Sequence, residues 1–123
     1  MPSQRVLASG VSWFDLLFQE RPNRIASVVV TGAAGTAIVD PGPTASLETL
    51  EASLAMQGQS LASVTHLLLT HIHLDHAGVT GTILRRHPDI RVVVHERGAR
   101  HLVDPSKLLE SAGRLYGDAM ERL

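Results

Sequence analysis

One short segment of the chain gathers four side chains that can bind a metal ion. Residues 70–78 read Thr-His-Ile-His-Leu-Asp-His-Ala-Gly and supply these four: His71, His73, Asp75 and His76. His71 and His73 stand at positions i and i+2 after an apolar run, so in extended backbone both imidazoles point the same way and can reach one ion. Three imidazoles and a carboxylate suit zinc, and iron or manganese are also compatible with these donors. The segment therefore predicts a metal site.

The composition restricts the chemistry that such a site can use. The chain has 123 residues and no cysteine, which excludes disulfides, thiolate zinc ligands and cysteine nucleophiles. The net charge is −1 and the basic residues are scattered, so we expect no nucleic-acid partner. With 44% hydrophobic and 19% charged residues, the chain is typical of a globular protein, and its length suits one domain.

Two targeting signals are not found in the sequence. No stretch reaches the roughly 18 apolar residues that a membrane span requires. The first residues do not follow the pattern of a signal peptide. We therefore expect no membrane partner and a cytoplasmic location.

The elements around the histidine segment must position its side chains. Residues 64–69 are mostly apolar and predict a buried strand that ends at the segment. Gly78 frees the backbone to bend into a helix predicted over residues 79–86, which Pro88 ends. Upstream, apolar and β-branched runs bounded by turn residues predict further strands, the last two as a hairpin: 6–8, 13–18, 25–31 and 36–40.

The remaining elements complete a layered arrangement. Thr44 is a candidate cap for a helix whose apolar side carries Leu47, Leu50 and Leu54. Residues 91–95 are rich in valine and predict a buried strand, and helical spacing predicts a last helix from Ser106 to the end. Strands followed by alternating helices and strands predict an α/β fold, layered as in α+β proteins, with a mixed sheet covered by helices.

The pattern Thr-His-x-His-x-Asp-His-x-Gly resembles the signature of the metallo-β-lactamase-fold hydrolases, in particular of their glyoxalase II-like and lactonase-like branch. The resemblance extends over about residues 25–101 and includes Val39-Asp40-Pro41-Gly42. It implies the N-terminal half of a four-layer αββα sandwich, so residues 1–123 are expected to form a single but incomplete domain of this kind.

The resemblance also implies roles for individual residues. His71 and His73 would bind a first metal ion, and Asp75 and His76 a second, giving two zinc ions in the complete site. Asp75 would also lie near a bridging hydroxide, which makes it the candidate catalytic residue. Asp40 would support the ligands by hydrogen bonding rather than bind the metal; the alternative is a simple turn aspartate before Pro-Gly.

The other histidines and nearby aspartates have weaker claims. His95 and His101 are candidates for a substrate pocket; the alternative for His95, which we favour, is a half-buried histidine that ends a strand. His66 precedes a buried strand and is expected to be structural. The rest are expected to be surface or capping residues: His87, Asp89 and Asp104.

The family pattern has a second half that this chain does not match. There the family places a further histidine, a metal-bridging aspartate and a last histidine, each well downstream of the motif. Two explanations remain open: the chain is a shortened form of a larger hydrolase, which we favour, or it is a half-fold that pairs with another chain. Pairing with an identical copy would not restore the missing ligands.

Two functions follow from these expectations. The first is a metal-dependent hydrolase of a small-molecule thioester, lactone or ester that uses a metal-activated hydroxide, with activity in doubt for the isolated chain. The second is a non-catalytic metal-binding or assembly half-domain that self-associates or pairs through its uncovered sheet face. Metal content together with esterase turnover discriminates between them.

Overall fold

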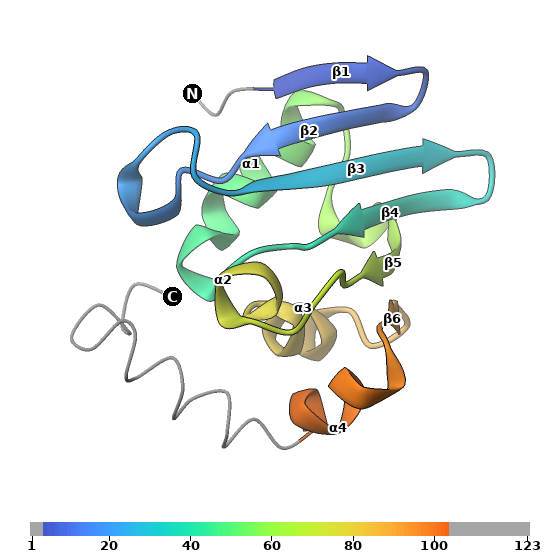
Figure 1. Cartoon of the computed structure of the whole chain (residues 1–123). Coiled ribbons are helices and arrows are strands. Elements are labelled where there is room, and N and C mark those ends of the chain that lie inside the picture. The colour runs from blue at the N-terminus through green and yellow to red at the C-terminus, as the bar shows by residue number, and fades with distance from the viewer. Residues whose placement is uncertain (1–3, 104–123) are drawn as a thin grey trace.

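The chain folds into one mixed sheet whose six strands lie side by side in the order of the sequence (Figure 1). The structure, a computed structural model, describes residues 4–103, so the predicted helix from Ser106 onward lies outside the described residues. The strands are β1 (Gln4–Ala8), β2 (Val11–Asp15), β3 (Ala26–Gly32), β4 (Gly35–Val39), β5 (Val64–Leu68) and β6 (Arg91–Val93). The predicted mixed sheet with covering helices is confirmed.

The direction of the strands brings two distant segments together. Strands β1 to β4 are antiparallel neighbours, whereas β4, β5 and β6 run parallel. Parallel neighbours need crossover connections, and helices supply them here. The carboxyl ends of β4, β5 and β6 therefore meet at one edge of the sheet. Asp40 follows β4 and the histidine segment follows β5 at this edge.

Several helices and one strand differ from the expectations. The helices are, with short 3₁₀ turns marked η, η1 (Phe18–Glu20), η2 (Thr44–Ser46), α1 (Leu47–Met56), η3 (Leu61–Ser63), α2 (Leu74–Ala77), α3 (Thr80–Arg86) and α4 (Glu96–Val103). Thr44 begins η2 and does not cap α1, which starts without a side-chain cap. Strand β6 is partly exposed rather than buried, because it lies at the edge of the sheet. Helix α4 was not predicted.

One face of the sheet carries the core. Leu50 and Leu54 of α1 and Ile83 of α3 are fully buried, in one cluster with residues of the inner face such as Ile38 and Leu67. Apolar burial of this kind is the main source of stability of the fold. It fixes the positions of β4 and β5, the two strands that lead to the histidine segment.

The opposite face of the sheet is apolar but not covered by the described helices. The strand register places one residue from each of five strands in a row across this face, each partly or largely exposed: Trp13, Val28, Val39, Leu68 and Val93. None of the described helices is long and apolar enough to cross a membrane.

Candidate metal centre

Asp40 is held rigidly at the end of β4. The backbone N–H of Asp40 donates to the carbonyl of Leu68 at 3.0 Å, and the carbonyl of Asp40 accepts from the hydroxyl of Ser27. Its φ of 52° lies in the left-handed region, which aspartate tolerates better than most residues. The residue is only 8% exposed. The carboxylate therefore projects from a fixed backbone toward the neighbouring strand end.

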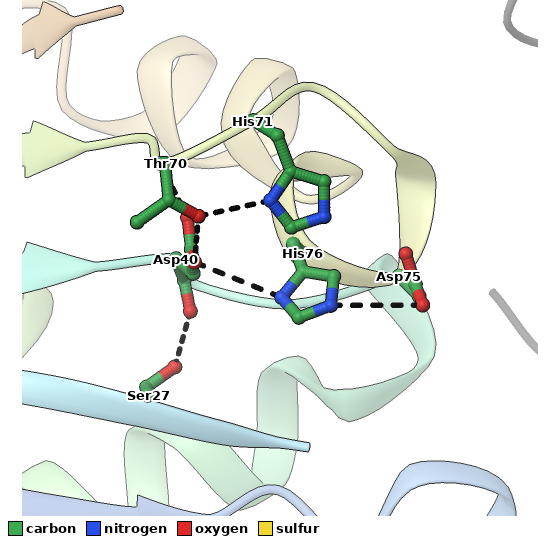
Figure 2. Close-up of polar contacts among 6 residues, drawn as sticks. All are labelled: Ser27, Asp40, Thr70, His71, Asp75 and His76. Atoms are coloured by element: carbon green, nitrogen blue, oxygen red, sulfur yellow. Dashed lines mark hydrogen bonds and ion pairs between the residues drawn. The ribbon is translucent and has the colours of Figure 1, made fainter. Parts of the chain in front are cut away.

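The carboxylate of Asp40 binds the first residue of the histidine segment twice. The backbone N–H of Thr70 donates to Oδ1 at 2.9 Å, and its hydroxyl donates to Oδ2 at 2.6 Å (Figure 2). Hydrogen bonds to a charged acceptor are the stronger kind. The pair ties the end of β4 to the point where β5 runs into the ligands.

This arrangement fixes which nitrogen of His71 carries the proton. The Thr70 hydroxyl has one proton and gives it to the Asp40 carboxylate, which can only accept. His71 Nδ1 lies 2.9 Å from the same hydroxyl oxygen, so Nδ1 must be the donor in that contact. The lone pair of His71 is then on Nε2, the nitrogen that a metal ion can use.

His76 lies between the two carboxylates of the site. Its Nδ1 is 3.7 Å from Asp40 Oδ2, and its Nε2 is 3.7 Å from Asp75 Oδ2 (Figure 2). Nδ1 is buried and has no hydrogen-bond partner among the described residues. With the proton on Nδ1, facing Asp40, Nε2 is left as a ligand beside the Asp75 carboxylate. A carboxylate behind a histidine nitrogen is the usual support of a metal-binding histidine.

The short helix α2 presents the rest of the donors. His73 precedes it as an exposed cap residue, and its carbonyl accepts from the N–H groups of His76 and Ala77 at 3.0 and 2.9 Å. The His71 ring lies 5.1 Å from the His73 ring and 4.2 Å from the His76 ring, centroid to centroid. All three imidazoles and Asp75 are therefore gathered at one strand edge, as the sequence predicted.

Gly42 joins the same edge through its backbone. Its N–H donates to the carbonyl of His76 at 2.8 Å, and its carbonyl accepts from Val79 at 3.0 Å. Its φ of +94° is one that residues with a side chain rarely adopt. Gly78 serves a different purpose from the predicted bend: its backbone is helical, but a Cβ there would collide with the carbonyl oxygen of Leu74.

Two groups of three donors have ligand atoms within 4.8 Å of one another in the described part of the chain: Asp40, His71 and His76; and His71, His73 and Asp75. In the first group Asp40 is buried, and Thr70 donates to both of its carboxylate oxygens. The second contains the exposed His73. Imidazole and carboxylate donors at this spacing fit zinc or a similar ion. The second group, with His76 Nε2 beside it, is therefore the better candidate for a metal site, and the hydrogen-bonded pair of Asp40 and Thr70 supports it.

The predicted pocket residues belong to neither of these groups. His95 is exposed at the start of α4, where its Nδ1 accepts from the N–H of Arg97 at 3.1 Å, and His101 lies within α4. A substrate role for either residue stays a prediction. His66 and His87 line a cleft of about 440 Å³ around the start of β5, at the opposite end of that strand from the motif, and no motif residue lines that cleft.

Sequence reasoning missed the roles of Thr70 and Gly42. Thr70 was part of the motif, but its hydroxyl acquires a function only because Asp40, 30 residues earlier, lies beside it. Gly42 acts through backbone groups, which carry no side-chain signal. The Asp-Pro-Gly sequence before a helix was the clue that this strand end is specially shaped.

The comparisons with known proteins agree with this geometry. The family model of the metallo-β-lactamase superfamily matches residues 21–120. Among solved structures, a subclass B3 metallo-β-lactamase of Bradyrhizobium japonicum has a TM-score of 0.69 at 23% identity, over 80% of this chain and 35% of that one. The metallo-β-lactamase FEZ-1 of Legionella gormanii has a TM-score of 0.69 at 18% identity, over 82% and 37%.

A β-lactamase from Chitinophaga pinensis has the same TM-score of 0.69 at 20% identity, over 82% of this chain and 36% of that one. The chain thus spans about a third of the length of these structures, and at such identities they share its fold alone. No curated protein matches the chain. The family match, which covers most of the sequence, is the decisive finding: this chain belongs to the metallo-β-lactamase superfamily.

Proposed function

We propose that the whole protein is a metal-dependent hydrolase of a small-molecule thioester, lactone or related ester, with two zinc ions in its complete site. The observation that supports the proposal most directly is the orientation of the histidines. His71 and His76 each have Nδ1 turned toward the Asp40–Thr70 pair, which leaves both Nε2 atoms for metal. An isolated surface cluster would have no reason to carry such support.

The residues of the chain divide into ligands and support. His71 and His73 would hold one ion, and Asp75 and His76 the other, because the last two present atoms 3.7 Å apart. Metal ions in such sites polarise a carbonyl and lower the pKa of water to near neutrality. Asp75, at the rim of the site with its side chain 23% exposed, would accept a hydrogen bond from the attacking water and orient it. Asp40 would keep two ligands in their binding tautomers.

The substrate class is argued from charge and from the nucleophile. A net charge of −1 with scattered basic residues provides no surface that would attract a polyanion. Cysteine is absent, so a cysteine acyl-enzyme route is closed and water is the expected nucleophile. The neighbours are described as β-lactamases, so a β-lactam belongs in the test as the competing substrate.

The test uses the purified chain loaded with zinc and two matched variants. His73→Ala removes an exposed ligand and should leave the fold intact, whereas His87→Ala removes a histidine outside the donor groups. A γ-lactone, an aliphatic thioester, a p-nitrophenyl ester and a chromogenic cephalosporin would be assayed with and without a chelator. Any ester or thioester turnover of the chain should be sensitive to the chelator, abolished in His73→Ala and retained in His87→Ala.

Metal binding is measured in parallel by titration with Co²⁺, whose absorption reports its ligands. The hydrolase proposal fails for this chain if Co²⁺ binding or turnover is unchanged in His73→Ala. Binding without turnover of any substrate would favour the non-catalytic metal-binding half-domain. Hydrolysis of the cephalosporin alone would move the substrate class from esters to β-lactams.

A further inference from the structure

We propose that Gly98 of helix α4 is a positioning residue for the metal ligands. Because Gly98 has no side chain, α4 packs closely against Ile72, the residue between His71 and His73. The inference rests on the proposed metal site. A Cβ built on Gly98 would lie 2.7 Å from Cγ2 of Ile72 and 3.3 Å from Cγ2 of Val94. The first distance is shorter than any normal carbon contact. Helix α4 therefore packs against the ligand loop at a point where only glycine fits.

The shape of Ile72 makes this contact rigid. Its Cγ2 branches from Cβ, so it cannot swing away as the end of a long side chain can, and β-branched residues are stiff about χ1. Its nearest neighbours in the chain are His71 and His73. A displacement of Ile72 is thus passed to the backbone of both ligands. Since metal ligands must be held within fractions of an ångström, such a shift weakens binding.

Backbone freedom does not account for this glycine. Gly98 lies inside α4 and has no positive φ, and glycine in a helix is less favourable than alanine. Close approach is the remaining physical reason for glycine at this position. Helix propensity and packing therefore make opposite predictions for alanine at Gly98, which allows the two to be separated.

The start of α4 is itself tied to the strand next to β5. The Nδ1 of His95 accepts from Arg97 N–H at 3.1 Å, and the carbonyl of His95 accepts from Gly98 N–H at 2.9 Å. Two residues before His95, the carbonyl of Val93 accepts from Leu69 N–H at 2.9 Å. These bonds join α4 to the strand end from which the ligands emerge. Helix α4 is therefore placed to brace the loop from the side opposite Asp40.

The test compares glycine substitutions in two helices. Gly98→Ala introduces the collision, whereas Gly81→Ala in α3 places a methyl group where no described atom beyond its chain neighbours and the backbone of its own helix lies within 4 Å. Co²⁺ affinity should fall about tenfold in Gly98→Ala, the lower end of the loss when a supporting group of a metal site is removed. The visible Co²⁺ spectrum should also change. Gly81→Ala should match the unmodified chain, and thermal unfolding followed by circular dichroism would verify that both variants fold.

A second substitution decides whether Ile72 transmits the effect. Ile72→Ala removes Cγ2 and should restore Co²⁺ affinity when combined with Gly98→Ala. Ile72→Val retains that methyl group and should not restore it. If Gly98 had a merely structural role, the two double variants would bind Co²⁺ alike. Equal Co²⁺ affinity and spectra in Gly98→Ala and Gly81→Ala would overturn the proposal that Gly98 positions the ligands. Rescue by both substitutions at Ile72 would overturn it as well.

A wrong metal site can be told apart from a wrong positioning role of Gly98. If the unmodified chain takes up no Co²⁺, the metal site is wrong for this chain, and NMR of the metal-free chain decides the packing. We then expect a nuclear Overhauser contact between Gly98 Hα and the Cγ2 methyl of Ile72. Ring signals of His71 and His73 should shift in Gly98→Ala but not in Gly81→Ala. Absence of the contact or of the shifts refutes the positioning role of Gly98.

Discussion

Thr70 links the support of the site to a ligand through a single hydroxyl, so its removal is a direct test of the arrangement. In Thr70→Val a methyl group replaces the hydroxyl, and the backbone N–H that donates to Asp40 Oδ1 is retained. Two contacts are lost: the 2.6 Å bond to Asp40 Oδ2 and the 2.9 Å contact with His71 Nδ1. Asp40 stays buried with one donor fewer, and His71 loses the group that selects its tautomer.

The magnitude follows from the two contacts. A hydrogen bond to a charged group contributes about 1.5–3 kcal/mol, and a neutral one about 1 kcal/mol. Thr70 is exposed, so water can replace part of both. We expect the free energy of unfolding to fall by about 2 kcal/mol, with the midpoint of thermal unfolding roughly 8 °C lower for a chain of this size. Co²⁺ affinity should fall about 10- to 100-fold, as when other supporting groups of metal sites are removed.

The matched control is Thr70→Ser, which retains the hydroxyl and loses only the methyl group. Urea unfolding and Co²⁺ titration would be measured for both variants and for the unmodified chain. We expect Thr70→Ser to bind Co²⁺ as the unmodified chain does. If Thr70→Val is as stable and binds Co²⁺ as tightly as Thr70→Ser, the hydroxyl neither stabilises Asp40 nor orients His71, and the reasoning is refuted.

Three further substitutions test separate parts of the same edge. Asp40→Asn retains the shape of the side chain and its tolerance for a φ of 52° but removes the charge. Co²⁺ affinity should therefore fall at least about tenfold, while the circular dichroism spectrum stays unchanged. Unaltered Co²⁺ affinity would argue against a supporting role of Asp40. Gly42→Ala combines a φ of +94° with a Cβ 2.5 Å from Cδ1 of Leu16, so urea unfolding should show a loss of about 1–3 kcal/mol, and a neutral result would contradict the tight turn. Arg86→Ala breaks an exposed 3.2 Å pair with Glu51 and should change stability by less than about 1 kcal/mol; a larger loss would show a more buried role.

The sequence predicts the parts of this fold that depend on local pattern. The mostly apolar run 64–69 followed by closely spaced histidines indicates a strand that leads into the histidine segment, and the structure has β5 there. The turn between residues 31 and 36 indicates a hairpin, which β3 and β4 form. In both cases the alternation and turn residues act within a few positions, so neighbours in sequence are sufficient evidence.

The parts that sequence reasoning missed depend on strand order or on unusual caps. The valines of β6 read as buried, but burial depends on which strand lies at the edge, and among the described strands β6 has a neighbour on one side only. Helix α4 begins at a histidine cap rather than at serine, threonine, aspartate or asparagine, and contains Gly98. Both features weaken the helical signal, and the second is explained by packing on Ile72.

The role of Thr70 was out of reach for a related reason. Its hydroxyl matters only because β4 and β5 are parallel and in a register that places Val39 opposite Leu68. That register brings Asp40, one residue after Val39, and Thr70, two residues after Leu68, to the same edge. A shift of one residue along either strand would separate the carboxylate from the hydroxyl and reverse the faces. The support of a metal site is therefore a tertiary property even where its ligands form a sequence motif.

The ligand segment is held from two sides by groups that the described chain supplies itself. Asp40 and Gly42 fix it from the end of β4, and Gly98 packs on it from α4, beyond the other neighbouring strand. The side chains of the exposed apolar row on the outer sheet face take no part in these contacts as far as the described residues show. The groups that orient the ligands, at the edge of the sheet, are thus separate from the residues of the apolar face. For this reason a chain that spans a third of its structural neighbours can still preorganise the histidines it carries.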